Sequence, residues 1–312
     1  MQHETGQLNQ RPFRTERDNV VSFDLPLEAP CPCESGLPTN SCCLTPKGIA
    51  TKAASTIPPS SKTGHSRKGC YAAFLNDCSS KLSREHPLSE SILRILNQKE
   101  RGGLRVSGLP WQEGDISQPI SPKSLTARIL CERHNSALSN LDSMAISLFR
   151  TFDNIAGNTE NKLHLFNGHD IERWLLKVLC GMFASNNLTP GRPVQRDIPV
   201  QWIEVLYQVK GFESGQGLYV CCSKGVTFNG PIGIALRPLG KENRIVGIGL
   251  WVCGFELILN MEPSRIQELL GRQVAYRPKE LHIAGSKYEK SVVLSWNEPA
   301  GRDTIHVKLL DK

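Results

Sequence analysis

A chain of 312 residues is too long for one small domain and suits two domains with an additional tail. It has no apolar run of about 18 residues, the length that a membrane helix needs, and no apolar stretch at its N-terminus, so we expect a cytoplasmic protein without a membrane partner. The net charge is +7, and residues 61–135 carry twelve Lys and Arg against seven Asp and Glu, an excess that would attract a phosphate backbone.

The composition divides the chain into five segments. Residues 1–29 are polar with few periodic apolar positions, and we expect them to be flexible. Residues 30–44 hold four closely spaced cysteines, and residues 45–68 are rich in Ser, Thr, Pro and Lys, as is typical of a linker. A folded region with helical patterns follows over 69–187, and residues 188–312 are rich in strand patterns.

Helical spacing of apolar residues within the folded region predicts two helices. One runs over 87–98, and a longer amphipathic helix runs over 170–183, with Asp170 as its N-cap. Between them we expect a short strand over 125–130 and a helix over 132–152.

The C-terminal region contains short β-branched segments separated by Gly, Pro and Asn, such as RIVGIGLWVCGFELIL and KSVVLSW. These patterns predict a mainly antiparallel sheet, sandwich or open barrel. One helix, over 263–271, ends at a glycine. The fold class predicted for the whole chain is therefore α+β.

Seven of the eleven cysteines precede residue 132. In a reducing cytosol clustered cysteines more often bind metal than form disulfides, and an exported disulfide-bonded protein is the alternative. The first four occur in the run CPCESGLPTNSCC, where Gly36 and Pro38 would turn the chain so that four thiolates meet one tetrahedral zinc ion. Such a fragment is too small to fold by burial alone, so the metal would supply its folding free energy. The four ligands predicted here are Cys31, Cys33, Cys42 and Cys43.

This spacing resembles the SEC-C motif, a small zinc-binding element attached to many bacterial proteins. The match includes the C-P-C run, the Ser35-Gly36 pair and the terminal pair of cysteines. The usual basic residues before that pair are replaced by Leu37, Pro38, Thr39 and Asn40, which removes a basic docking surface but no zinc ligand.

The second cysteine group is dispersed. Cys131 and His134 are three residues apart at the start of a predicted helix, so both can face one ion. With Cys70 and Cys78 they predict a second, Cys₃His zinc site, and isolated buried thiols are the alternative. The next residue, Asn135, is turned about 100° from His134 by the helical period, so it can serve a different, reactive centre.

Three features of this region resemble the HNH nuclease superfamily with its ββα-metal core. They are the pair Glu85-His86 in the run SREH, the pair Cys131 and His134 in the run LCERHN, and Asn135 directly after it. That family places an acidic residue and a histidine at the end of its first strand, and a histidine or asparagine on its helix.

The resemblance covers residues 69–145 and implies a metal-dependent nuclease that hydrolyses nucleic-acid phosphodiester bonds. His86 would be the general base that activates water. Asn135 and Glu85 would hold Mg²⁺ or Mn²⁺ on the scissile phosphate, in addition to about two structural zinc ions in the chain.

Three departures from the family pattern leave a second function open. The first cysteine pair is separated by seven residues, His134 stands where a cysteine is common, and Ser124 occupies the position of the family's middle asparagine. The alternative is a non-catalytic zinc protein that uses the same scaffold to bind nucleic acid or a protein partner. A protein partner would meet the SEC-C-like module or the β-rich region.

Overall fold

The computed structural model describes most of the chain after residue 26, and the described ranges are 27–46, 48–99, 104–107, 118–153, 162–187, 197–222, 234–241, 244–252, 254–265, 274–284, 289–297 and 304–308. The predicted flexible segment 1–29 lies almost entirely outside them. So does most of the predicted helix 263–271, of which only a 3₁₀ turn, η3 (Pro263–Arg265), is described. No helix in the described ranges is long and apolar enough to cross a membrane.

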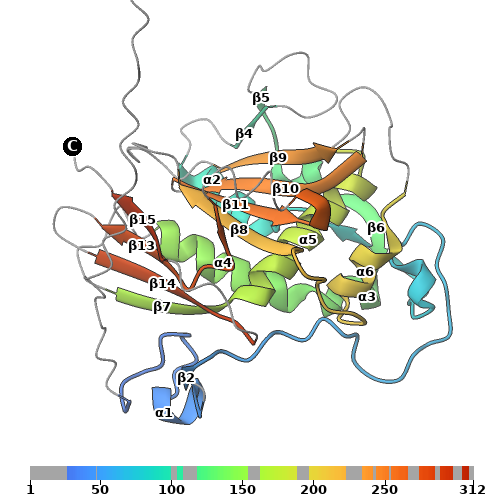
Figure 1. Ribbon diagram of the computed structural model, residues 1–312. Coiled ribbons are helices and arrows are strands. Elements are labelled where there is room, and N and C mark those ends of the chain that lie inside the picture. Colours follow the sequence, from blue (N-terminus) through green and yellow to red (C-terminus); the bar gives the residue numbers. More distant parts are fainter. Residues whose placement is uncertain are drawn as a thin grey trace, which may run out of the picture.

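The protein has the predicted α+β fold, with an N-terminal cysteine cluster and an antiparallel C-terminal sheet (Figure 1). The larger sheet has five strands in the order β12-β8-β11-β10-β9, and every described pairing in it is antiparallel. Its strands are β8 (Gly217–Cys222), β9 (Ile234–Lys241), β10 (Arg244–Val252), β11 (Phe255–Asn260) and β12 (Ala275–Tyr276).

A second sheet of four strands is mixed and has the order β15-β13-β14-β7. Here β13 pairs antiparallel with β14, whereas the outer strands β15 and β7 pair parallel with them. The strand β7 is not among the sequence predictions. The strands are β7 (Lys162–Asn167), β13 (Glu280–Ala284), β14 (Glu289–Ser295) and β15 (Thr304–Lys308).

Helix α5 (Gly168–Ala184) packs against both sheets, since it contacts β8, β10 and β11 of the larger sheet and β7 of the smaller one. It also contacts α4 (Ser139–Asp153) and α6 (Val200–Leu206). One hydrophobic core extends from Cys70 to Leu294 and includes residues from both the predicted zinc region and the predicted β-rich region.

Two details of the predicted helices are wrong. The N-cap of α5 is Asn167, whose side chain accepts a hydrogen bond from the backbone N–H of His169, and Asp170 is buried inside the helix. The long helix predicted over 132–152 is broken at Leu138 into α3 (Glu132–Ala137) and α4. The Ser139 hydroxyl donates to the backbone carbonyl of Ser136 at 2.8 Å, a local bond that satisfies one carbonyl at the end of α3.

Two paired strands and a helix carry the residues beside the second cysteine group. Strand β3 (Leu82–Glu85) pairs antiparallel with β6 (Ala127–Cys131), and α3 follows β6 directly. The register shifts between Ser83 and Glu85, and bulges of this kind re-aim the side chains beside them. In the sequence, the segment between β3 and β6 contains α2 (Glu90–Lys99), the short pair β4 (Arg105–Val106) and β5 (Gln118–Pro119), and the 3₁₀ turn η2 (Pro122–Leu125).

The N-terminal unit docks on the edge of the smaller sheet. It consists of α1 (Thr39–Cys42) and a short hairpin of β1 (Leu44–Thr45) and β2 (Gly48–Ile49). The backbone N–H of Leu165 in β7 donates to the Pro32 carbonyl at 3.1 Å, and Leu165 packs against the N-terminal cysteines. In Figure 1 the unit (blue) lies below β7.

The chain between this unit and the second cysteine group runs as an ordered strap, residues 50–63. Thr51 hydrogen-bonds to Ser295, and the backbone N–H of Ala54 donates to both oxygens of Asp170. The buried Thr56 hydroxyl donates to the Leu206 carbonyl at 2.7 Å. These bonds tie the strap to the smaller sheet, to α5 and to α6.

We expect Thr56→Val to lower the free energy of unfolding by about 1–2 kcal/mol, because the Leu206 carbonyl would lose its buried donor. Urea unfolding followed by circular dichroism measures this difference. Thr126→Val is the matched control, since its hydroxyl also donates to a backbone carbonyl, that of Lys123, but at an exposed place where water can replace it. Equal losses for both variants would contradict the expectation that burial makes the Thr56 bond more stabilising than an exposed one.

Candidate functional site

The N-terminal cluster, Cys31, Cys33, Cys42 and Cys43, forms a compact group whose ligand atoms lie within 4.8 Å of one another. The sulfur of Cys42 is 3.5 Å from that of Cys33 and 3.7 Å from that of Cys43. Zinc–sulfur bonds of about 2.3 Å in a tetrahedron place two sulfurs about 3.8 Å apart, so the geometry fits one zinc ion.

Local structure explains how this short run gathers four thiols. The backbone N–H of Cys31 donates to the Leu37 carbonyl, and Gly36 adopts φ of +79°, a conformation that favours glycine. Burial alone would raise the pKa of Cys33, but hydrogen bonds from Ser35 and from neighbouring thiols lower it to about 7. One thiolate is therefore accessible near neutral pH, as metal binding requires.

The second cluster, Cys70, Cys78, Cys131 and His134, is fully buried and also has its ligand atoms within 4.8 Å of one another. The Nδ1 atom of His134 is 3.2 Å from the sulfur of Cys131, 3.6 Å from that of Cys70 and 3.7 Å from that of Cys78. A tetrahedral zinc ion with these ligands would hold nitrogen and sulfur about 3.5 Å apart, so the predicted Cys₃His set is brought together at the right spacing.

His134 is prepared for metal binding by its charge state and by its position. Burial lowers its pKa to about 4, so the ring is neutral and Nδ1 can offer a lone pair. The ring packs edge-on against Tyr207 at 5.0 Å, and the Tyr207 hydroxyl donates to the backbone carbonyl of His134. Next to it, Arg133 binds Asp77 and the backbone carbonyls of residues 59–61, which fixes the strap beside the cluster.

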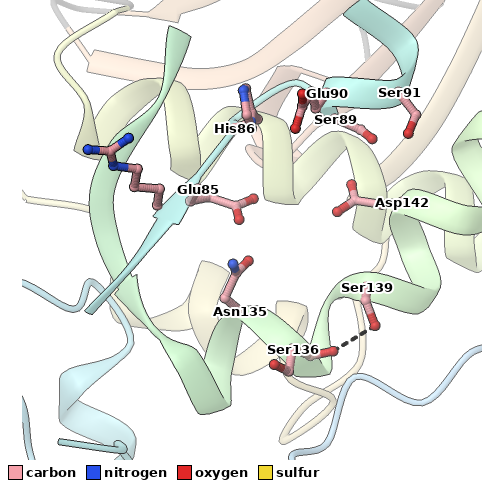
Figure 2. A pocket seen from close by; sticks show the side chains of 10 residues that line it. Glu85, His86, Ser89, Glu90, Ser91, Asn135, Ser136, Ser139 and Asp142 are labelled. Carbon is pink, nitrogen blue, oxygen red and sulfur yellow. Dashed lines mark hydrogen bonds between the residues drawn. The ribbon is translucent and has the colours of Figure 1, made fainter. Parts of the chain in front are cut away.

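A pocket of about 340 Å³ lies beside the second cluster, and the three predicted catalytic residues Glu85, His86 and Asn135 all line it. Figure 2 shows Glu85 and Asp142 pointing toward each other across this space, with Asn135 rising from α3 below them. Its full lining is Arg84, Glu85, His86, Ser89, Glu90, Ser91, Asn135, Ser136, Ser139 and Asp142.

A buried lysine joins two of these carboxylates. The Nζ atom of Lys177, on α5, is 2.7 Å from Glu85 Oε1 and 2.7 Å from both carboxylate oxygens of Asp142. Its side chain is only 2% exposed. Burial alone would lower the pKa of Lys177, but the two carboxylates raise it, so the ammonium stays charged.

Glu85 and Asn135 line the same pocket wall; burial raises the pKa of the Glu85 carboxyl, while Lys177 and Asn135 act to lower it. The Asn135 side chain also carries an amide oxygen, which can bind a cation. Oxygen ligands of this type suit Mg²⁺ or Mn²⁺, which often use one or two carboxylates together with water and substrate phosphate. The residues on this wall therefore fit a divalent ion.

His86 lies at the rim of the pocket, beside Glu90 (Figure 2). Burial lowers its pKa, so its ring is neutral near pH 7. Its Nε2 atom is buried and has no hydrogen-bond partner among the described residues. Ser124, the counterpart of the family's middle asparagine, is exposed in η2, donates to the Ser121 carbonyl and does not line the pocket.

Sequence reasoning missed Asp142 and Lys177. Asn135, Ser139 and Asp142 are spaced four and three residues apart, which is one face of a helix, and this spacing was the available signal for Asp142. For Lys177 the signal was a single charge within the apolar run WLLKVLCG.

Comparisons with protein-family models, with curated proteins and with solved structures each find no match for this chain.

We expect elemental analysis of the purified protein to give about two zinc ions per chain, one for each four-ligand cluster. Cys131→Ala should lower this value to about one and destabilise the protein, because it removes one ligand of the second cluster. Cys180→Ala is the matched control, since Cys180 is equally buried but belongs to neither cluster. A zinc content that stays at two in Cys131→Ala would contradict the ligand assignment.

Proposed function

We propose that this protein is a metal-dependent nuclease of the HNH type, which hydrolyses phosphodiester bonds in nucleic acid. One observation carries the proposal: the ββα order and the second cluster bring Glu85, His86 and Asn135 to one pocket. These three residues come from two distant parts of the chain, and the sequence pattern predicts all three as catalytic residues of a nuclease. The excess of basic residues over 61–135 supports a polyanionic substrate.

In this proposal two of the residues bind a divalent ion and the third accepts a proton. Glu85 and Asn135 would hold the divalent ion through one oxygen each. The ion, when bound, would stabilise negative charge on the scissile phosphate and on the leaving oxygen. His86 would accept the proton of the attacking water, for which a neutral ring is needed. Its Nε2 atom would have to gain contact with that water when substrate binds, since it is buried in the free protein.

A second candidate function is favoured by the same burial of His86 Nε2 and by the position of Ser124. The Nε2 atom of His86 has no hydrogen-bond partner among the described residues, and Ser124 is exposed outside the pocket, so Ser124 does not replace the family's middle asparagine in orienting the ring. This candidate is a non-catalytic protein in which two zinc clusters stabilise a nucleic-acid-binding or protein-binding surface.

We expect the zinc-loaded protein to nick plasmid DNA or cut RNA when Mg²⁺ or Mn²⁺ is added. His86→Ala should lower the rate by about 10²–10⁴-fold, the usual contribution of a general base. Asn135→Ala should also reduce cleavage, and its loss should be partly recovered at higher Mn²⁺ because it removes an ion ligand. Gel-based cleavage rates across a metal titration measure both effects.

Asn140→Ala is the matched control, because Asn140 is exposed on α4, outside the pocket. Metal-dependent cutting that survives His86→Ala would contradict the assignment of the base. Nucleic acid that is bound but left uncut with every metal tested, by protein that retains its zinc, would favour the non-catalytic function.

A further inference from the structure

The gap between Glu85 and Asp142 already contains a cation. Two carboxylates that face each other across a pocket are a common place for a divalent ion. Here the ammonium of Lys177 is 2.7 Å from oxygens of both, and it belongs to a helix outside the ββα unit. Figure 2 shows the two carboxylates pointing toward each other across the pocket.

Lys177 is fixed there by its surroundings. Lys177 is only 2% exposed, and its neighbours Trp174, Val178 and Cys180 are completely buried in the core. It cannot move out into solvent without breaking two ion pairs inside a low-dielectric region, a strongly unfavourable change.

The ammonium occupies the position that an ion between the two carboxylates would take. Its nitrogen–oxygen distances are 2.7 Å, whereas Mg²⁺ needs metal–oxygen distances of about 2.0–2.1 Å, so the carboxylates would have to move closer by about 0.6 Å for such an ion to bind there. A dication and the ammonium cannot share the gap, because like charges at such distances repel strongly.

We propose that Lys177 is a positioning residue, which keeps divalent ions out of the gap between Glu85 and Asp142 and so directs the ion to the Asn135 side of Glu85. By contacting Oε1, the ammonium leaves the second oxygen of Glu85 for the ion. Asp142 balances the lysine's charge, so that the pair adds little repulsion toward an ion bound nearby. The inference rests on the proposed function, because that function places the catalytic ion between Glu85 and Asn135.

The experiment is a Mn²⁺ titration of the zinc-loaded full-length protein, with free Mn²⁺ followed by its electron paramagnetic resonance signal. Lys177→Met removes the ammonium and leaves two carboxylates facing each other. We expect this variant to bind Mn²⁺ at least about tenfold more tightly than the wild type, because the ion gains a second carboxylate and loses a repelling charge. Nucleic-acid cleavage should fall at the same time, because the ion is misplaced.

A purely structural role would predict a loss of both Mn²⁺ affinity and cleavage. Three variants separate these explanations. Lys177→Arg keeps the charge and should show no gain in Mn²⁺ affinity. Lys177→Gln is neutral and should show the gain. The double variant Lys177→Met with Asp142→Asn should lose the gain, since one carboxylate is removed.

The stability of Lys177→Met provides a further readout. If the variant is unstable alone, Mn²⁺ should raise its melting temperature by more than it raises that of the wild type, because the ion replaces the missing charge. A folded variant with unchanged Mn²⁺ affinity, or an unfolded one that Mn²⁺ does not restore, would overturn the inference. A wild-type protein that cuts no nucleic acid would instead contradict the proposed function and leave the Mn²⁺ titration valid.

Discussion

The arrangement of the second cluster is the constraint on which the pocket depends. Its ligands come from the loop around Cys70 and Cys78, from the end of β6 and from the first turn of α3. An ion bound by all of them fixes where α3 begins, and Asn135 is the residue directly after the last ligand. Because Glu85 ends the strand that pairs with β6, the same constraint sets the distance between Glu85 and Asn135. The residues of the second cluster therefore shape a pocket that they do not themselves line.

The sequence predicted what depends on short-range pattern and missed what depends on tertiary contacts. The members of both cysteine clusters were grouped from the sequence because their residue types and spacing carry that information locally, and the structure brings each group together. The roles of Glu85 and His86 stay a prediction. Strand β7 was missed, since its partner β14 lies far away in the chain and its polar residues, among them His164, are buried only after the N-terminal unit and α4 pack around them. The buried ion pairs of Lys177 likewise depend on three elements that meet only in the folded state.

The charge that faces the pocket does not come from the ββα unit alone. Helix α5 contacts strands of both sheets and also carries Lys177, so a helix that packs against the β-rich part supplies the charge that faces Glu85. The continuous core makes this possible, because it holds α5 rigidly between both parts of the protein. Variation in the β-rich part can thus alter the electrostatics of the pocket without a change in any residue that lines it.

The strap has a consequence for the order in which the chain assembles. Thr51 meets Ser295 across a sequence separation of 244 residues, and Ser295 meets the Phe166 carbonyl across 129. Contacts of such range are slow to form, because a long loop must close before they contribute. During synthesis the N-terminal unit emerges before β7 and β14, the strands that carry Leu165 and Val293 against its cysteines. The cysteines of the N-terminal cluster therefore lack these neighbours until both strands have been made, and early capture of metal would protect them during that interval.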